Sequence, residues 1–307
     1  MTKIKISTKP LKMVAPRGAE GQALINNNAS GLRQDNIYPE LKVLQGDEFV
    51  EKFGKTRQGW EKAIYSGGAL VNLVGKNYSI LSNENFFGEI EKQLKDKDIK
   101  VMTRSINRDN RAFCMEQILS DDRYSVTVKN SKDEIRPMLS FTTSYDGSTK
   151  TQGHFGIFRK VCNNGAHISQ SEIGFSLKRR GDLEYVVIGE VEKLIQKFMD
   201  NEFYEIRKKF EVLAETPISN LKDYVKMVCH ETEIFKFEKS EENESPSKTA
   251  EKVIEIMLKE SKMLGESNSL WLGYNAFNQV LHNSKKGFQA AYNWDAKLFD
   301  FHMELTN

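Results

Sequence analysis

Cys162 and the residues around it offer the most chemistry in the chain. Residues 144–168, SYDGSTKTQGHFGIFRKVCNNGAHI, combine an Asp-Gly turn, an Arg-Lys pair, this cysteine and an Asn-Asn-Gly cluster. A cysteine nucleophile requires a positioned histidine base, and no signature joins Cys162 to any of the five histidines. His154, Cys162 and His167 are potential metal ligands, but their H-x7-C-x4-H spacing matches no common site. We expect Cys162 to pack as a small buried residue, with a thiol enzyme and a metal site as alternatives.

The sequence lacks the motifs that bind nucleotide cofactors. There is no G-x-x-x-x-G-K-[ST] loop and no G-x-G-x-x-G after an expected strand, so neither an NTPase nor a dinucleotide enzyme is predicted. Asp121 and Asp122 are adjacent acids, and neighbours in a strand point to opposite faces, which does not suit joint metal binding. We interpret them as turn residues and expect no cofactor and no metal.

Basic residues gather in the middle of the chain. Residues 100–180 carry 14 basic and 8 acidic residues, whereas residues 181–307 carry 16 and 23. Arginine and lysine neutralise phosphates, and exposed aromatic rings stack on bases at roughly 1–3 kcal/mol each. The middle segment therefore predicts a nucleic-acid surface, with core aromatics and ordinary solvated cations as the alternative. The residues predicted to bind are Arg104, Arg108, Arg136, Tyr145, Lys150, Arg159, Lys160, Asn163 and Asn164.

Three regions of the chain would position these residues. Residues 1–40 are poor in large apolar side chains and predict an extended polar arm. Residues 41–182 predict an α+β core with an antiparallel sheet, and residues 183–307 predict a helical region with a charged loop at residues 238–249. The predicted fold class is therefore α+β, in which a helix precedes a central antiparallel sheet and a helical C-terminal half follows it.

Periodicity predicts individual elements within these regions. Residues 41–65 are interpreted as two short helices, and residues 83–94 as the helix before the sheet, capped by Asn83. The Asp-Gly pair at residues 146–147 predicts a hairpin, because glycine accepts the positive φ angles of a tight turn. An apolar repeat of three and four residues predicts one long helix over residues 183–214. Further helices are predicted at residues 221–235, 250–264 and 270–283.

Composition argues against a membrane or secreted protein. The mean hydropathy is −0.55, and no apolar run approaches the length of about 18 residues that a spanning helix needs. Residues 1–10 contain no apolar stretch of the kind found in a signal peptide. The three cysteines lie far apart and predict neither a disulfide framework nor a zinc ribbon. We expect reduced thiols and a cytoplasmic protein of the host cell.

Four segments of the chain stand out as motifs. They are LVGKNYSILSNENFF (73–87), SYDGSTKTQGHFGIFRKVCNNG (144–165), LKRRGDLEYVVIGEVEKLI (177–195) and SLWLGYNAFNQVLHN (269–283). Together they resemble a family of phages, plasmids and genomic islands that is built on a widespread domain of unknown function. The resemblance covers roughly residues 66–285 and implies a mobile-element origin without an assigned activity. Many relatives have a histidine before the aspartate where this chain has Ser-Tyr-Asp-Gly, so no catalytic role is carried over to that position. GKNYSILSNENFFGEIEKQL (75–94) is also similar to the opening of the Rad-type single-strand annealing recombinases.

These observations predict a single-stranded nucleic-acid-binding protein of a phage or plasmid. Its sheet would hold bases unstacked for annealing or recombination while cations offset phosphate repulsion, without catalysis. The expected partners are single-stranded DNA, with RNA as an alternative, and further copies of the chain in a homo-oligomer. The alternative from another class is a phage interaction protein, either a counter-defence factor that binds a host enzyme or a structural virion component.

Overall fold

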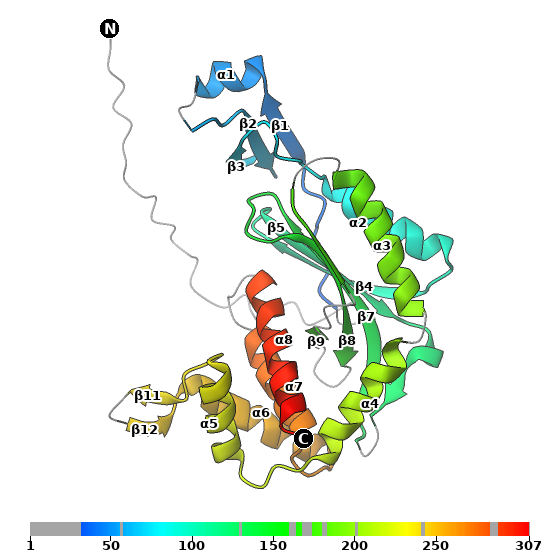
Figure 1. Ribbon diagram of the computed structural model, residues 1–307, viewed down its shortest axis with the longest axis vertical. Coiled ribbons are helices and arrows are strands. Elements are labelled where there is room, and N and C mark those ends of the chain that lie inside the picture. The colour runs from blue at the N-terminus through cyan, green and yellow to red at the C-terminus, as the bar shows by residue number, and fades with distance from the viewer. Residues whose placement is uncertain are drawn as a thin grey trace. The chain divides into compact units, whose positions relative to one another are not determined.

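The computed structural model describes residues 32–55, 58–128, 131–159, 164–167, 174–179, 183–199, 202–240, 243–282 and 288–306. Its largest element is an antiparallel sheet of seven strands with the order β10-β8-β7-β5-β4, in which β6 pairs with β7 and β9 with β8 (Figure 1). The strands are β4 (Val101–Arg108), β5 (Ala112–Leu119), β6 (Val126–Thr127), β7 (Glu134–Ser144), β8 (Thr151–Arg159), β9 (Asn164–His167) and β10 (Gly174–Leu177). The predicted α+β class with a central antiparallel sheet is confirmed.

The two faces of the sheet differ in chemistry, because neighbouring residues of a strand point to opposite sides. One face, here called the aromatic face, carries Phe113, Phe141 and Phe155, which belong to the main core. It packs against α2 (Asn83–Asp96) and α3 (Leu183–Met199) (Figure 1). The other face, here called the polar face, carries Cys114, Ser140 and Thr142. Its helical neighbour is α8 (Phe288–Glu304), which bonds to Ser140 through Tyr292.

Local sequence explains why α2 begins where it does. Ser82 is the N-cap of α2, and its side chain accepts a hydrogen bond from the Asn85 N–H at 3.0 Å. The sequence had predicted Asn83 as the cap, one residue later. The Asn83 side chain instead donates to the Ile37 carbonyl at 2.5 Å. Phe86, Phe87, Ile90 and Leu94 form the buried stripe of α2, as their spacing predicts.

The C-terminal half is helical, as predicted. Besides α3 and α8 it contains α4 (Glu202–Glu215), α5 (Leu221–Thr232), α6 (Lys248–Leu264) and α7 (Leu270–His282). All described residues within the single long helix predicted over residues 183–214 are helical, in α3 and α4. The two residues between α3 and α4 lie outside the described residues, so the continuity of the predicted helix stays a prediction.

A second, smaller sheet replaces the two helices predicted at residues 41–65. It has the order β1-β2-β3 and consists of β1 (Leu41–Gln45), β2 (Lys62–Ser66) and β3 (Ala69–Val74). Among the described residues of that stretch, those of α1 (Asp47–Phe53) are the helical ones. Phe49 and Phe53 gave the helical spacing, and their rings lie 5.1 Å apart. The strands on either side are too short for their alternation to dominate the pattern.

Two segments that were expected to lack regular structure form backbone hydrogen bonds typical of β-structure. Gln34 forms a parallel bridge with Ser105, so the end of the predicted polar arm lies along the edge strand β4. The Asp35 N–H donates to the Ser105 carbonyl at 3.1 Å, and the Ser105 N–H donates to the Arg33 carbonyl at 2.9 Å. The charged loop predicted at residues 238–249 contains a hairpin of β11 (Glu238–Ser240) and β12 (Asn243–Pro246). Its backbone groups pair with each other, which composition alone does not predict.

Candidate nucleic-acid interface

Two hairpin turns meet at one end of the seven-stranded sheet, here called the hairpin end. Strands β5 and β7 pair Ala112 with Ser144, and the Tyr145 N–H donates to the Arg111 carbonyl at 2.7 Å. The β4–β5 turn contains Asp109 and Asn110, both with a φ of 54°. These pairings bring the tip of the β4–β5 hairpin next to the start of the β7–β8 hairpin.

The hairpin end carries cations from both turns. Arg111 and Lys150 are exposed, and within the described ranges neither side chain has an ion-pair partner. Arg108 is half-buried at the end of β4, and burial is the main cause that lowers its pKa. Repulsion from Arg33 lowers the pKa of Arg108 further. Arg33 is held by Asp35, whose carboxylate lies 2.5 Å from it. Arg111 and Lys150 therefore present two exposed cations at this end.

Arg104 lies on the polar face of β4, four residues before Arg108 at the hairpin end. Its guanidinium bonds to the buried carboxylate of Glu116, the residue directly opposite it on β5. Opposite charges at such directly paired positions stabilise the pairing of two strands. Arg104 is therefore committed to an ion pair within the sheet, and its charge is compensated.

Tyr145 is buried, although the sequence predicted it as a base-stacking residue. Its ring packs edge-on against Phe113, with 5.3 Å between the ring centroids. Its hydroxyl accepts a hydrogen bond from the Asn83 N–H at 3.0 Å. Burial raises the pKa of Tyr145 to about 12. Tyr145 therefore links the hairpin end to the start of α2 and presents no ring face to solvent.

Two further predicted residues, Arg136 and Arg159, lie at the opposite end of the sheet. Arg136 stands eight residues before Ser144 on β7, a separation of about 26 Å along a strand. It donates to the Ser120 carbonyl and to the exposed Asp122 carboxylate, both at 2.8 Å. The described members of the sequence-predicted set are thus divided between two ends of the sheet and do not form one site.

Arg159 belongs to a buried ionic cluster at this opposite end. Its side chain is 1 % exposed and bonds to the carboxylates of Asp133 and Glu260, the latter at 2.5 Å. The Trp271 indole donates to Asp133 at 2.9 Å, and the guanidinium carbon lies 5.8 Å from the centre of the Trp271 ring system. Burial raises the pKa of both Asp133 and Glu260, and Arg159 counteracts that rise. The cluster joins β8 to α6 and α7, so we assign Arg159 a structural role and leave it out of the interface.

The polar cluster after β8 lies mostly outside the described residues. Lys160, Cys162 and Asn163 are not described, so the predictions for them stay predictions. Asn164 begins β9 and pairs with Arg159, and its backbone alone is described. Among the side chains that the structure describes, no three His, Cys, Asp or Glu residues are grouped to hold a metal ion.

The polar face offers a second cysteine, Cys114, at the centre of the sheet. Its sulfur lies 3.7 Å from the Ser140 hydroxyl, which in turn bonds to the Tyr292 hydroxyl. The Tyr292 and His154 rings lie 4.5 Å apart. Burial, with a smaller contribution from Glu116, raises the pKa of the Cys114 thiol well above its usual range. A protonated, buried thiol is a poor nucleophile, so this arrangement does not favour thiol chemistry.

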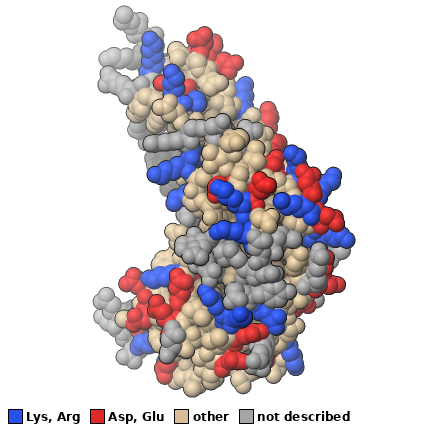
Figure 2. Space-filling view, turned by 45° about the vertical axis from the view of Figure 1, so that its right-hand side comes forward, with Lys and Arg blue, Asp and Glu red and all other residues tan. Residues whose placement is uncertain are grey.

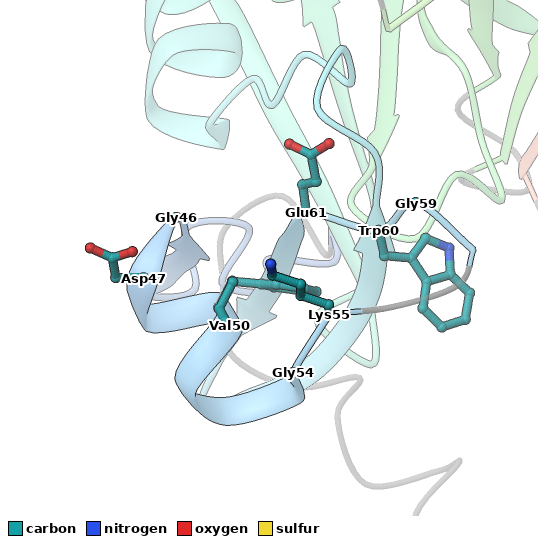
Figure 3. Close-up of a pocket in the computed structure, with 9 residues that line it drawn as sticks. Gly46, Asp47, Val50, Gly54, Lys55, Gly59, Trp60 and Glu61 are labelled. Atoms are coloured by element: carbon teal, nitrogen blue, oxygen red, sulfur yellow. The ribbon is translucent and has the colours of Figure 1, made fainter.

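A pocket beside α1 was missed by the sequence analysis. Its volume is about 370 Å³, and Trp60, which is 38 % exposed, stands at its rim (Figure 3). Figure 3 shows the indole turned away from Lys55. Three glycines with positive φ, at positions 46, 54 and 59, line the pocket and were the available sequence signal. The charged lining residues are Asp47, Lys55 and Glu61, and this net negative lining does not suit a phosphate.

Charge on the face of the molecule drawn in Figure 2 is mixed in sign. Figure 2 shows Lys and Arg interspersed with Asp and Glu over the face that it displays, so cations occur there in local groups. A local group such as the one at the hairpin end can contact a few phosphates, whereas a continuous basic stripe would follow a longer strand. Among the helices that the structure describes, none has the length and apolarity required to cross a lipid bilayer.

Comparison with known proteins places the chain in one family. No curated protein and no solved structure matches it significantly. A model of a domain of unknown function, DUF932, matches residues 71–298, which include the seven-stranded sheet and α2 to α7. This span is similar to the one covered by the four sequence motifs. The chain therefore belongs to the DUF932 family.

Proposed function

We propose that this protein binds single-stranded nucleic acid at the hairpin end of its sheet and promotes annealing or recombination without catalysis. We further propose that it is encoded by a phage or plasmid and acts as a homo-oligomer in the cytoplasm of the host cell. The observation that carries the proposal is the pair of exposed cations, Arg111 and Lys150, which have no ion-pair partner among the described residues. Such groups bind phosphates with the release of counterions.

The geometry supports a contact with the backbone of the strand rather than with its bases. Arg108, half-buried at the end of β4, adds a third positive charge at this end of the sheet. Tyr145 is buried and therefore offers no platform for stacking. Phosphate contacts position a strand without reading its sequence. We therefore expect weak sequence preference.

Exposed apolar residues on α3 support the proposed oligomer. Tyr185 is 78 % exposed, and Val186 and Ile188 are also exposed on the same helix. Residues three apart on a helix are neighbours, so Tyr185 and Ile188 lie on one side of it. Single exposed apolar side chains are ordinary on a protein surface, whereas neighbouring ones that form a contiguous patch can mark a contact with a partner. A second copy of the chain is the partner that we propose.

The dependence of binding on salt tests the interface directly. We expect Arg111→Ala combined with Lys150→Ala to weaken binding of a fluorescent oligodeoxynucleotide and to reduce the slope of log K against log salt by about 1.4, roughly 0.7 for each lost phosphate contact. An oligoribonucleotide of equal length shows whether RNA is bound equally well. The matched control is Lys252→Ala with Lys259→Ala, which removes two exposed cations from α6. An unchanged slope in the first variant would remove the hairpin end from the interface.

Loss of all binding in the unmodified chain would have a different meaning. If neither DNA nor RNA binds, the alternative of a phage interaction protein, either a counter-defence factor or a virion component, gains support. Size-exclusion chromatography with light scattering, with and without oligonucleotide, measures assembly separately. A monomer under both conditions would contradict the proposed homo-oligomer.

A further inference from the structure

Arg179 lies on the aromatic-face side of the hairpin end, in a setting unlike that of the exposed cations. It follows β10, and its carbonyl accepts a hydrogen bond from the Ser79 N–H at 3.2 Å. Its guanidinium donates to the Thr143 hydroxyl on β7. The guanidinium carbon lies 5.9 Å from the centre of the Tyr78 ring. The side chain is thus held between the sheet and the segment that leads into α2.

Several donors in this group have no acceptor. Nε and Nη1 of Arg179 and the hydroxyl of Tyr78 are buried from solvent and have no hydrogen-bond partner among the described residues. The arginine atoms can only donate, and the tyrosine hydroxyl donates one hydrogen. A ligand that satisfies these hydrogen-bond donors therefore needs more than one acceptor oxygen.

The charge of Arg179 is also uncompensated at close range. Within the described part of the chain, no carboxylate lies within ion-pair distance of Arg179. Burial lowers the pKa of Arg179, whereas Tyr78, Tyr145 and Asp146 act in the opposite direction. Asp146 is engaged in its own turn, where its carboxylate accepts from the Ser148 N–H at 2.9 Å. Buried cations in proteins are normally paired, and a buried cation without a counter-ion destabilises the fold.

We propose that Arg179, Tyr78 and Thr143 form a binding site for a phosphoryl group. A phosphate presents several oxygens to the planar fork of an arginine and can accept from two of its nitrogens at once. Tyr78 and Arg179 are each partly exposed, although the unmet atoms themselves are not. The site therefore lies just beneath the surface, where a small anion or the end of a strand fits better than the middle of a polymer.

The phosphoryl group has two sources, free phosphate and the terminal phosphate of a nucleic-acid strand. The first source is independent of the proposed function, since a free anion needs no strand. The second source rests on the proposed function and would place a 5′ end beside the hairpin end. Comparing inorganic phosphate with oligonucleotides that carry either a 5′-phosphate or a 5′-hydroxyl distinguishes the two sources.

Thermal stability in the presence of phosphate tests the site. We expect inorganic phosphate to raise the Tm of the full chain beyond the effect of chloride at equal ionic strength, because a ligand that binds only the folded state stabilises it. Arg179→Met should abolish this rise. Without phosphate the same variant should be at least as stable as the natural chain, since replacing an unpaired buried charge with an apolar group removes a cost.

A second variant keeps the test valid if Arg179→Met does not fold. Tyr78→Phe retains the ring and removes only the unmet hydroxyl, so the affinity for phosphate should fall by about tenfold, the loss of one charge-assisted hydrogen bond. Lys178→Ala removes an exposed neighbouring cation and serves as the control with an unchanged phosphate response. The proposal is overturned if neither phosphate nor a 5′-phosphorylated oligonucleotide raises the Tm. It is also overturned if Arg179→Met or Tyr78→Phe responds as the natural chain does.

Discussion

Replacing Arg159 with methionine should destabilise the protein severely, and mainly near neutral pH. Arg159 is the cation of a cluster in which Asp133 and Glu260 are both buried. Methionine has a similar length and no charge, so the substitution leaves two carboxylates without their counter-ion. Breaking a buried ion pair by removing one partner costs about 3–5 kcal/mol. We expect a loss of that size in the free energy of unfolding at about pH 7.

The loss should shrink as the pH falls. Burial already raises the pKa of Asp133 and of Glu260 in the folded chain, and without Arg159 both values rise further. A carboxyl whose pKa is higher in the folded state binds more protons there, so stability falls as pH rises from the unfolded value, near 4, through the folded value. At about pH 5 a larger share of these carboxyls is neutral in the variant, and less of the penalty remains.

Urea unfolding followed by circular dichroism at both pH values measures the effect. Arg111→Met is the matched control, because that arginine is exposed and should change stability by less than about 0.5 kcal/mol. The triple variant Arg159→Met, Asp133→Asn, Glu260→Gln should recover most of the loss, since its buried groups carry no charge. A loss below about 1 kcal/mol at neutral pH, or one that does not change with pH, would refute this account of the cluster.

Two further predictions concern residues in helices. Burial lowers the pKa of His302 to about 4, and its Nδ1 forms a hydrogen bond with the Leu298 carbonyl. The folded state therefore favours the neutral imidazole. This contribution to the free energy of unfolding is fully present above the unfolded pKa, about 6.5, and is lost as the pH falls toward 4. His302→Gln should remove the part of the decrease in Tm at acid pH that is due to this histidine. A variant whose Tm depends on pH as that of the natural chain does would contradict this role of His302. Gly88→Ala, with open space around the new methyl group, should stabilise by about 0.5–1 kcal/mol, whereas Gly273→Ala meets the Tyr224 hydroxyl and should cost about 1–3 kcal/mol. Equal effects of the two alanines in urea unfolding would argue against this packing.

Sequence periodicity predicted an element well where one side of it faces water. The buried stripe of α2 recurs at helical spacing because its opposite face is exposed. The pattern of residues around Cys114 does not distinguish a helix from a strand, and the segment forms β5, in which all eight residues are buried. A strand that is covered on both faces has no alternation to detect. Periodicity therefore recognised the outer elements and gave no answer at the centre of the sheet.

The candidate site could be predicted only in part, because the pairing of charges is a long-range property. Arg159 follows a strand and looks like a free cation, yet its partners Asp133 and Glu260 lie 26 and 101 residues away in the chain. Arg111 and Lys150 look no different in sequence, and only the fold shows that these two remain exposed. Composition correctly located an excess of cations between residues 100 and 180 but could not separate those that stabilise the sheet from those that face solvent.

The segment that lies along β4 has a consequence for how copies of the chain can meet. An edge strand with unpaired backbone groups is a template onto which another chain can add a strand. Here the backbone of Arg33 and Asp35 occupies the N–H and carbonyl of Ser105, in the middle of that edge. Continuous strand addition at β4 is thereby blocked. Growth of the sheet from one molecule into the next is therefore disfavoured at the β4 edge, and contacts between copies at this edge must rely on side chains.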